Sequence, residues 1–183
     1  MATIYSTDGL AVNLKNYFET ERLRIGPLAY KNALFILELV NTPGWLKFIG
    51  DRNLKNTADA RAYIQKIKNL VNVKYWTVYL KDENRPIGII TFIKRDYLDQ
   101  PDIGFAFLPR FTKAGYAIEA TAAVLNSLRT DQGLKSILAT TLPDNIDSIG
   151  LLVKLAFRLE KQIAVDGLNL LVYKLQFDGV RAG

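Results

Sequence analysis

The chain has 183 residues, and its 49% hydrophobic and 23% charged residues are an ordinary composition for a globular protein. This length predicts a single domain over 1–183, with a core that needs no disulfide or metal. The absence of cysteine and histidine excludes thiolate nucleophiles, zinc fingers, disulfides and histidine-based catalysis. Any acid–base step must then use Asp, Glu, Tyr, Lys, a hydroxyl or water.

The net charge of +6 and the pI near 9.4 are compatible with a nucleic acid, an anionic cofactor or an acidic partner. No stretch approaches 18 consecutive apolar residues, so we expect no membrane span. The first residues lack the basic and apolar regions of a signal peptide. We therefore expect a cytoplasmic protein.

The spacing of apolar residues switches between the two-residue period of strands and the 3.6-residue period of helices. Residues 1–20 follow neither period, and we expect an irregular N-terminal arm there. In chain order, the predicted elements begin with a strand at 22–28, a helix from Ala29 to Val40 and a short helix at 44–50. A helix from about Thr57 to Leu70 follows, with Asn56 or Thr57 as its N-cap, and then strands at 74–81, 86–94 and 102–108. The remaining elements are a helix from about Gly115, a strand at 134–142, a helix after Pro143 and a hairpin around Asp166-Gly167. This order predicts a mixed sheet with helices packed against it.

The loop between the strand at 102–108 and the next helix carries two cations, Arg110 and Lys113. A helix N-terminus offers unpaired N–H groups and the positive end of the helix dipole, so it can bind phosphate. Gly115 would let the backbone approach such a ligand closely. One glycine and two cations are also common in an ordinary strand–helix loop, so these residues alone leave both interpretations open.

Three stretches together resemble the GNAT superfamily of acetyl-coenzyme A-dependent N-acetyltransferases. They are TERLRIGPL at 20–28, RFTKAGYAIEA at 110–120 and PDNIDSIGLLVKLAFRLE at 143–160. The second matches the pyrophosphate-loop pattern of the family, and the third matches its Pro-x-Asn-x-x-Ser-x-x-x-Leu-x-Lys-x-Gly-Phe pattern. Within the superfamily the chain is similar to the branch of the ribosomal-protein N-terminal (alanine and serine) acetyltransferases. The resemblance implies an α/β fold of the α+β type, with a mixed, mostly antiparallel sheet of about seven strands and helices on both faces.

Three residues depart from the family pattern. Lys113 stands where the loop has its first glycine, and a lysine is restricted at positive φ. Ala156 replaces the glycine before Phe157, and we expect only a change of packing there. Leu152 occupies the position at which much of the superfamily has a tyrosine acid, which this branch commonly lacks as well.

The resemblance also implies roles for individual residues. Backbone groups of Phe107 and Leu108 would bond to the pantetheine arm of acetyl-coenzyme A (acetyl-CoA), and an amide near Leu108 would polarise the thioester carbonyl. Asn145 would contact the pantetheine, and Ser148, one helical turn later, would lie near the thiolate leaving group. From the residues alone, Asn145 could instead be a helix N-cap and Ser148 a small surface residue. The residues expected to hold the pyrophosphate run from Arg110 to Ala117 and include Lys113, Ala114, Gly115 and Tyr116.

The candidate base is Asp102, in the place of a glutamate that this branch often has at the start of the strand. The resemblance implies that it takes the proton of the acceptor amine directly or through water. A carboxylate at the end of a strand could also be purely structural. Glu119 matches the family too, but its position at a helix start favours a partner of the helix dipole over a catalyst, and Tyr116 is expected to pack.

The predicted function is acetyl transfer from acetyl-CoA, as co-substrate, to a primary amine, either a protein N-terminus or a small amine. No cysteine is available for an acetyl-enzyme, so we expect a direct ternary-complex mechanism. One alternative is a catalytically silent module that binds coenzyme A or a partner, and another is a basic RNA- or ribosome-binding domain. We expect no metal, DNA or membrane partner, and a monomer or homodimer.

Overall fold

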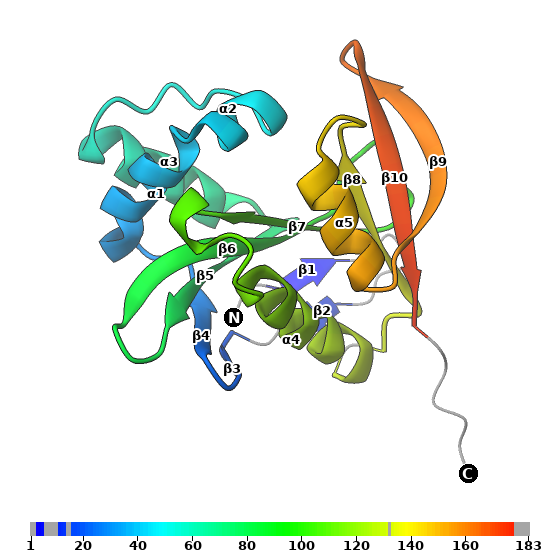
Figure 1. The fold of residues 1–183 in the computed structure, drawn as a ribbon, viewed down its shortest axis with the longest axis horizontal. Coiled ribbons are helices and arrows are strands. Elements are labelled where there is room, and N and C mark those ends of the chain that lie inside the picture. Colours follow the sequence, from blue (N-terminus) through cyan, green and yellow to red (C-terminus); the bar gives the residue numbers. More distant parts are fainter. Residues whose placement is uncertain (1–2, 6–10, 14–15, 132, 178–183) are drawn as a thin grey trace.

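The computed structural model describes residues 3–5, 11–13, 16–131 and 133–177, and Figure 1 shows their arrangement. One sheet has eight strands in the order β3-β4-β5-β6-β7-β8-β10-β9, and β1 and β2 form a separate two-stranded sheet. The strands are β1 (Thr3–Tyr5), β2 (Ala11–Asn13), β3 (Phe18–Glu19), β4 (Leu23–Pro27), β5 (Val73–Leu80), β6 (Arg85–Ile93), β7 (Asp102–Phe107), β8 (Ser136–Thr141), β9 (Arg158–Val165) and β10 (Leu168–Gln176). The helices are α1 (Ala33–Val40), α2 (Pro43–Phe48), α3 (Thr57–Asn69), α4 (Tyr116–Thr130) and α5 (Ile146–Lys154), with two short 3-10 helices, η1 (Tyr30–Asn32) and η2 (Pro109–Phe111).

One pair of neighbouring strands in the large sheet differs from the rest. Within the described residues all neighbours are antiparallel except β7 and β8, which run parallel. Their ladder consists of a single pair, Asp102 with Leu138, and beyond it the two strands diverge (Figure 1). A parallel connection needs a crossover, which α4 supplies. The sheet is therefore split near its middle.

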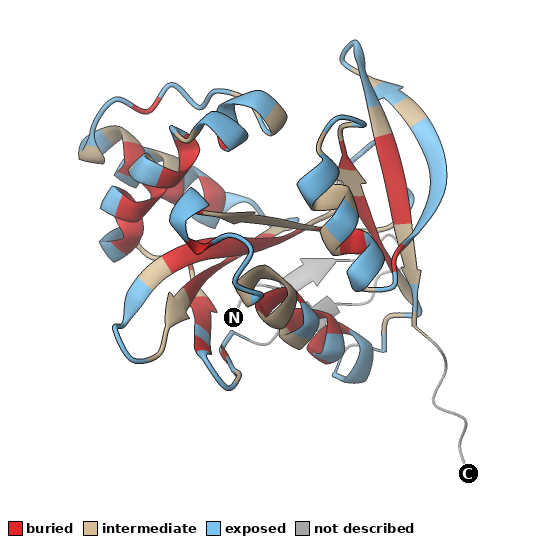
Figure 2. Cartoon of the chain, in the orientation of Figure 1, coloured by how far each residue is buried: buried red, intermediate tan, exposed pale blue. Residues whose placement is uncertain are grey.

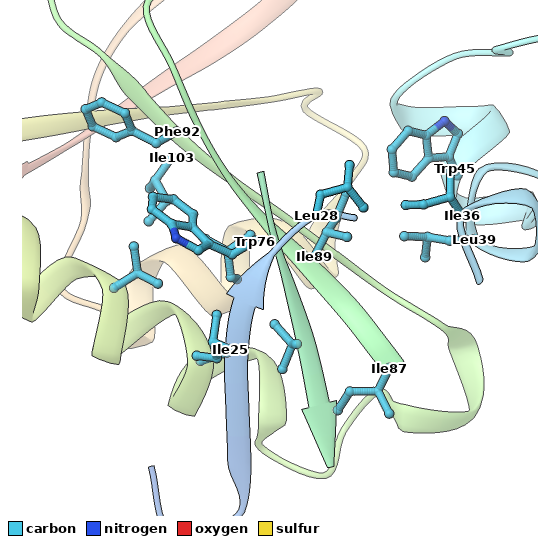
Figure 3. Close-up of a cluster of buried hydrophobic side chains, with 14 of the residues drawn as sticks. Ile25, Leu28, Ile36, Leu39, Trp45, Trp76, Ile87, Ile89, Phe92 and Ile103 are labelled. Carbon is cyan, nitrogen blue, oxygen red and sulfur yellow. The ribbon is translucent and has the colours of Figure 1, made fainter. Parts of the chain in front are cut away.

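Helices cover both faces of this sheet. On one face α1 contacts β6 and α3 contacts β5, and on the other face α4 contacts β3, β4, β6 and β7. Trp76 is wholly buried on the α4 side, where its ring meets Phe18 edge-on at 5.7 Å. Figure 3 shows Leu28 on the opposite side, with Ile36 and Leu39 of α1. This arrangement confirms the predicted mixed, mostly antiparallel sheet with helices on both faces.

Local sequence signals explain where several elements begin and turn. The Asn56 side chain accepts a hydrogen bond from Asp59 N–H at 3.0 Å, and the Asp59 carboxylate accepts one from Asn56 N–H at 3.3 Å. This capping box starts α3 at the predicted place. Asp166 and Gly167 have φ of 50° and 79°, as a two-residue type I′ hairpin turn requires. Every element predicted from residue 22 onward is present.

The expectation of an irregular arm over 1–20 is wrong for part of that segment. β1 pairs with β2, and β3 extends the large sheet beside β4 through the pair Phe18 and Ile25. The sheet accordingly has eight strands instead of about seven. Strands of two or three residues are too short to show a period in the sequence.

The end of α5 corrects a second expectation. Ala156 has φ of 65°, and the N–H groups of Ala156 and Phe157 donate to the carbonyls of Val153 and Leu152, both at 3.0 Å. This is the Schellman motif, whose left-handed residue is usually glycine because a Cβ is disfavoured there. The replacement of the family's glycine by Ala156 therefore strains the backbone, and is more than a change of packing.

None of the helices in the described part of the chain combines the length and the apolar character needed to cross a membrane.

Candidate functional site

The split between β7 and β8 is the candidate site. Because these strands are parallel, α4 and α5, which follow them, both begin at the same edge of the sheet, and the two helices contact each other. Ligands of open α/β sheets bind in such a crevice, outside the carboxyl ends of the strands. Residues 104–107 of β7 are only half-buried although the strand lies inside the sheet (Figure 2).

The free edge of β7 follows from the alternation of its hydrogen bonds. Leu108 N–H donates to Ile87 C=O at 2.9 Å, so in this register the even-numbered residues of β7 direct their backbone groups toward β6. Phe105 and Phe107 then direct their N–H and C=O groups toward β8, beyond the single pair that joins the two strands. These groups can bind an extended ligand as an added strand would.

This geometry agrees with the expectation for Phe107 and corrects the one for Leu108. Leu108 N–H is bonded to Ile87, its carbonyl accepts from Phe111 N–H at 2.9 Å, and its side chain is fully buried. Leu108 thus has no N–H group left to polarise a thioester. Phe105, which the sequence analysis did not single out, takes its place on the free edge. The signal that could have found it is the alternation of large and small residues along 102–108.

The start of α4 presents backbone N–H groups to solvent. Gly115, with φ of 83°, precedes the helix without a side-chain cap, and Glu119 N–H donates back to its carbonyl at 3.1 Å. The positive end of the helix dipole lies here. The N–H groups without an intrahelical partner are those of Tyr116, Ala117 and Ile118.

Two backbone N–H groups in the turn before α4 are already hydrogen-bonded within the turn and so cannot bind an anion. The N–H groups of Phe111 and Thr112 already donate to the carbonyls of Leu108 and Pro109, at 2.9 and 3.2 Å. Residues 113–115 are exposed. Lys113 has φ of 62°, the conformation that its place at a family glycine leads us to expect.

Two of the three family-like stretches contact each other through Arg22. Its Nη1 donates to Ala114 C=O at 3.0 Å, and its Nε and Nη2 reach the Glu119 carboxylate at 2.7 and 2.6 Å. Its guanidinium also lies 4.5 Å from the centre of the Tyr116 ring, and the Thr20 hydroxyl donates to Glu119. Arg22 therefore ties the exposed loop to the first turn of α4.

Glu119 is the carboxylate that accepts the hydrogen bonds of this network. Burial acts to raise its pKa, but the hydrogen bonds from Thr20 and Arg22 and the Arg22 charge outweigh burial, so the pKa of Glu119 lies below its ordinary value. The ionised carboxylate thus acts on the loop through Arg22, in agreement with a structural role for Glu119. Sequence reasoning gave no signal that residues 97 positions apart would pair.

Arg110 points to a different partner from the one expected. In the structure its exposed guanidinium forms an ion pair with Glu38 of α1. The hydrogen bond from Arg110 lowers the pKa of Glu38, burial opposes this, and the Arg110 charge adds to the lowering. Exposed pairs of this kind contribute little to stability and exchange partners easily. A phosphate contact for Arg110 stays a prediction.

Asn145 and Ser148 lie at the start of α5, across the split from Phe107. The Asn145 Oδ1 accepts from Ser148 N–H at 3.2 Å, which is the N-cap role left open by the sequence. Both side chains are half-buried, and the Asn145 amide nitrogen is not used by the cap. Leu152 is fully buried, so the position of the superfamily's tyrosine acid holds a core residue.

Asp102 lies at the closed end of the split, in the one pair between β7 and β8. Its side chain is 3% exposed, and its Oδ2 accepts from Arg95 Nε at 2.9 Å and from the Thr140 hydroxyl at 3.3 Å. Its Oδ1 is buried without a hydrogen-bond partner. Burial raises the pKa of Asp102, and the charge and hydrogen bond of Arg95 oppose that rise. The structure thus encloses the predicted base and joins it to Arg95, which the sequence analysis did not single out.

A comparison with known protein families identifies the family, and its match covers most of the large sheet and its helices. A model of the acetyltransferase (GNAT) domain matches residues 22–158, from Arg22 through both strands of the split and α5 to the first residue of β9. The chain belongs to the GNAT acetyltransferase family. The resemblance inferred from the three stretches is thereby confirmed.

Relatives agree with this assignment. The GNAT chain is 31% identical over 144 residues to an uncharacterized N-acetyltransferase, YnaD, of Bacillus subtilis (strain 168), covering 79% of this chain and 84% of that protein. A GNAT-family acetyltransferase from Bacillus anthracis superposes with a TM-score of 0.76 at 25% identity, over 87% of this chain and 98% of that one. RimJ of Mycobacterium smegmatis, in complex with CoA-disulfide, shares the fold with a TM-score of 0.73 at 18% identity, over 87% and 84% of the two chains.

Proposed function

We propose that this GNAT protein transfers acetyl from acetyl-CoA to a primary amine within a ternary complex. The observation that carries the proposal is the free edge of β7, which leads into the exposed residues 113–115 and the uncapped start of α4. The family assignment and the CoA-disulfide complex of a protein with the same fold support it.

The residues present fit acetyl-CoA in two ways. Phe105 and Phe107 offer unpaired N–H and C=O groups in the two-residue spacing that the amides of a pantetheine arm can use. The N–H groups at the start of α4, with the positively charged Lys113 beside them, suit a pyrophosphate. When bound, acetyl-CoA would supply an acetyl group activated as a thioester.

Three further steps of the transfer need a partner: the thioester carbonyl must be polarised, the thiolate must be stabilised as it leaves, and the acceptor amine must lose a proton. Phe107 adjoins the loop, and Phe105 lies further along the free edge toward the closed end, so we assign the Phe105 N–H to the thioester carbonyl. The Ser148 hydroxyl would donate to the departing thiolate. The acceptor ammonium must lose a proton before it attacks, and because the Asp102 carboxylate is enclosed and bonded to Arg95, we assign that proton to water.

Release of free thiol from acetyl-CoA in the presence of an amine panel tests this proposal, with the acetylated product identified by mass. Thiol release that depends on the amine, together with a product heavier by one acetyl group, is the expected result. A raised melting temperature with acetyl-CoA but no turnover with any amine would instead support a silent coenzyme A-binding module, which the enclosure of Asp102 favours. The absence of any thermal shift at millimolar acetyl-CoA would refute both.

A further inference from the structure

The face of the sheet opposite α4 has an open strip along β7. The cross-strand register places Tyr75, Thr91 and Gly104 in one row, with Asp102 two residues along on the same face. A Cβ at Gly104 would lie only 2.6 Å from the Thr91 hydroxyl oxygen, so a side chain there would displace the Thr91 hydroxyl. Gly104 and Ala106 are half-buried, and β7 therefore offers a flat floor beside its free edge.

Arg95 stands at one end of this floor. Asp102 accepts a hydrogen bond from its Nε alone, at 2.9 Å, and a third of the Arg95 side chain, 33%, remains exposed. Its guanidinium also lies 5.9 Å from the centre of the Tyr97 ring. A buried carboxylate that binds an arginine adds little to stability, because desolvation offsets the attraction between the charges. What the pair does supply is a guanidinium held at Nε, with its terminal nitrogens not bonded to Asp102.

A second arginine and two tyrosines extend the polar surface. Tyr63 of α3 interacts with Tyr75 of β5, and burial, with Tyr63 beside it, raises the pKa of Tyr75 above its ordinary value. The charges of Arg52 and Arg95 oppose that rise without cancelling it. The Tyr75 hydroxyl therefore stays protonated and uncharged.

We propose that Arg95, positioned by Asp102, binds a carboxylate on the acceptor, and that the preferred acceptor is an amine carrying a carboxylate nearby. The inference rests on the proposed acetyl transfer and specifies its substrate class. A planar guanidinium fixed at Nε matches the two oxygens of a carboxylate, and the positive charge of Arg52, which also acts on Tyr75, has the same preference. In this account Asp102 is a positioning residue and not the base.

The same charges disfavour polyamines and aminoglycosides as acceptors. Arg52 and Arg95 would repel a second ammonium group, whereas Asp102 is already paired with Arg95. One further acidic group that acts on this cluster is Asp166 in the β9–β10 turn, through Tyr97. Asp166 could balance the single positive charge of an amino acid but not the several charges of a polyamine.

Matched amines with and without the carboxylate test the inference. Phenylalanine is compared with phenethylamine, lysine with cadaverine, and a dipeptide Ala-Asp amide with Ala-Asn amide, which separates a free amino acid from a peptide that carries the carboxylate in its second residue. We expect a lower KM for the carboxylate member of at least one pair. Arg95→Gln should raise that KM about 10- to 100-fold, as expected for a lost charge-assisted contact, and leave the KM of the carboxylate-free member unchanged.

Three further measurements keep binding separate from folding. Arg95→Lys should recover part of the KM, and Asp102→Asn should raise KM more than it lowers kcat. Calorimetric binding of N-acetylphenylalanine to the coenzyme A-loaded protein should weaken in the Arg95→Gln variant, which gives a readout independent of turnover. Arg129→Gln, on α4 and hydrogen-bonded to Asn126, is the matched control, and the acetyl-CoA thermal shift checks that each variant is folded.

Two results would overturn the inference without touching the proposed function. One is turnover in which the carboxylate-free amines are acetylated as well as or better than their partners. The other is an Arg95→Gln variant whose KM changes equally for both members of a pair, which would make Arg95 purely structural. Loss of acetyl-CoA binding or of all turnover in the unaltered protein would instead defeat the proposed function.

Discussion

The replacement of Arg22 by lysine tests whether the 20–28 stretch organises the coenzyme loop. Arg22 bridges two acceptors, the Ala114 carbonyl at 3.0 Å and the Glu119 carboxylate at 2.6–2.7 Å. A lysine ammonium keeps the charge but lacks the fork that reaches both acceptors at once. At least one hydrogen bond to a charged group is therefore lost.

The structure sets the size of the expected effect. A hydrogen bond to a charged group contributes about 1.5–3 kcal/mol, but the Arg22 side chain is 44% exposed, and water replaces part of the lost contact. We therefore expect a loss of about 1 kcal/mol in the free energy of unfolding. This corresponds to a fall of about 2–4 °C in Tm for a chain of this size. If the freed loop must be ordered again on binding, the Kd for acetyl-CoA rises about fivefold.

Scanning calorimetry and isothermal titration with acetyl-CoA measure these two changes. Arg24→Lys is the matched control, because Arg24 lies two residues later, in β4, with an exposed side chain. An Arg22→Lys variant that melts and binds acetyl-CoA like Arg24→Lys would refute the positioning role of Arg22.

The other predictions concern single groups. Ala156→Gly should raise the free energy of unfolding by about 1 kcal/mol, because glycine accepts φ of 65°, and a lower Tm in calorimetry would contradict the strain. Glu119→Gln should reduce stability at neutral pH, but less so in acid: the pKa of Glu119 is lowered in the fold, so its contribution is complete above the ordinary value near 4.5 and disappears as the pH falls through the lowered one. A difference in denaturation midpoint that stays constant down to about pH 3 would argue against this. Ser148→Ala should lower kcat about 10- to 100-fold with an unchanged acetyl-CoA Kd, and a normal kcat would remove Ser148 from the mechanism.

Local sequence patterns were sufficient for the elements of this fold from residue 22 onward. Alternation in 102–108 fixed which side chains of β7 share a face, and the turn residues Asp166 and Gly167 fixed the last hairpin. Side-chain period and turn chemistry are properties of a few neighbouring residues, so they can be read without knowing the rest of the chain. The two- and three-residue strands before Thr20 have no such period, and the prediction failed there.

The site depends on features that a single stretch does not contain. Leu108 was expected to offer an amide, but which edge of β7 is free depends on its register with β6, and this assigns the edge to Phe105 and Phe107. The ion pair of Asp102 with Arg95 depends on how the β6–β7 connection folds back over the strand. The register of β7 with β6 and the path of the β6–β7 connection both depend on contacts between distant parts of the chain. The sequence therefore indicated the region of the site, and the structure was needed to identify the individual groups.

Backbone hydrogen exchange with and without acetyl-CoA tests whether the coenzyme binds in the split between β7 and β8, because the proposed site consists of named backbone amides. Acetyl-CoA should slow exchange at Phe105, Phe107 and residues 113–117, and leave the amides of α3 unchanged. Exchange that is unaltered along β7 and at the start of α4, or slowed only elsewhere, would contradict the assignment of the β7–β8 split as the coenzyme site.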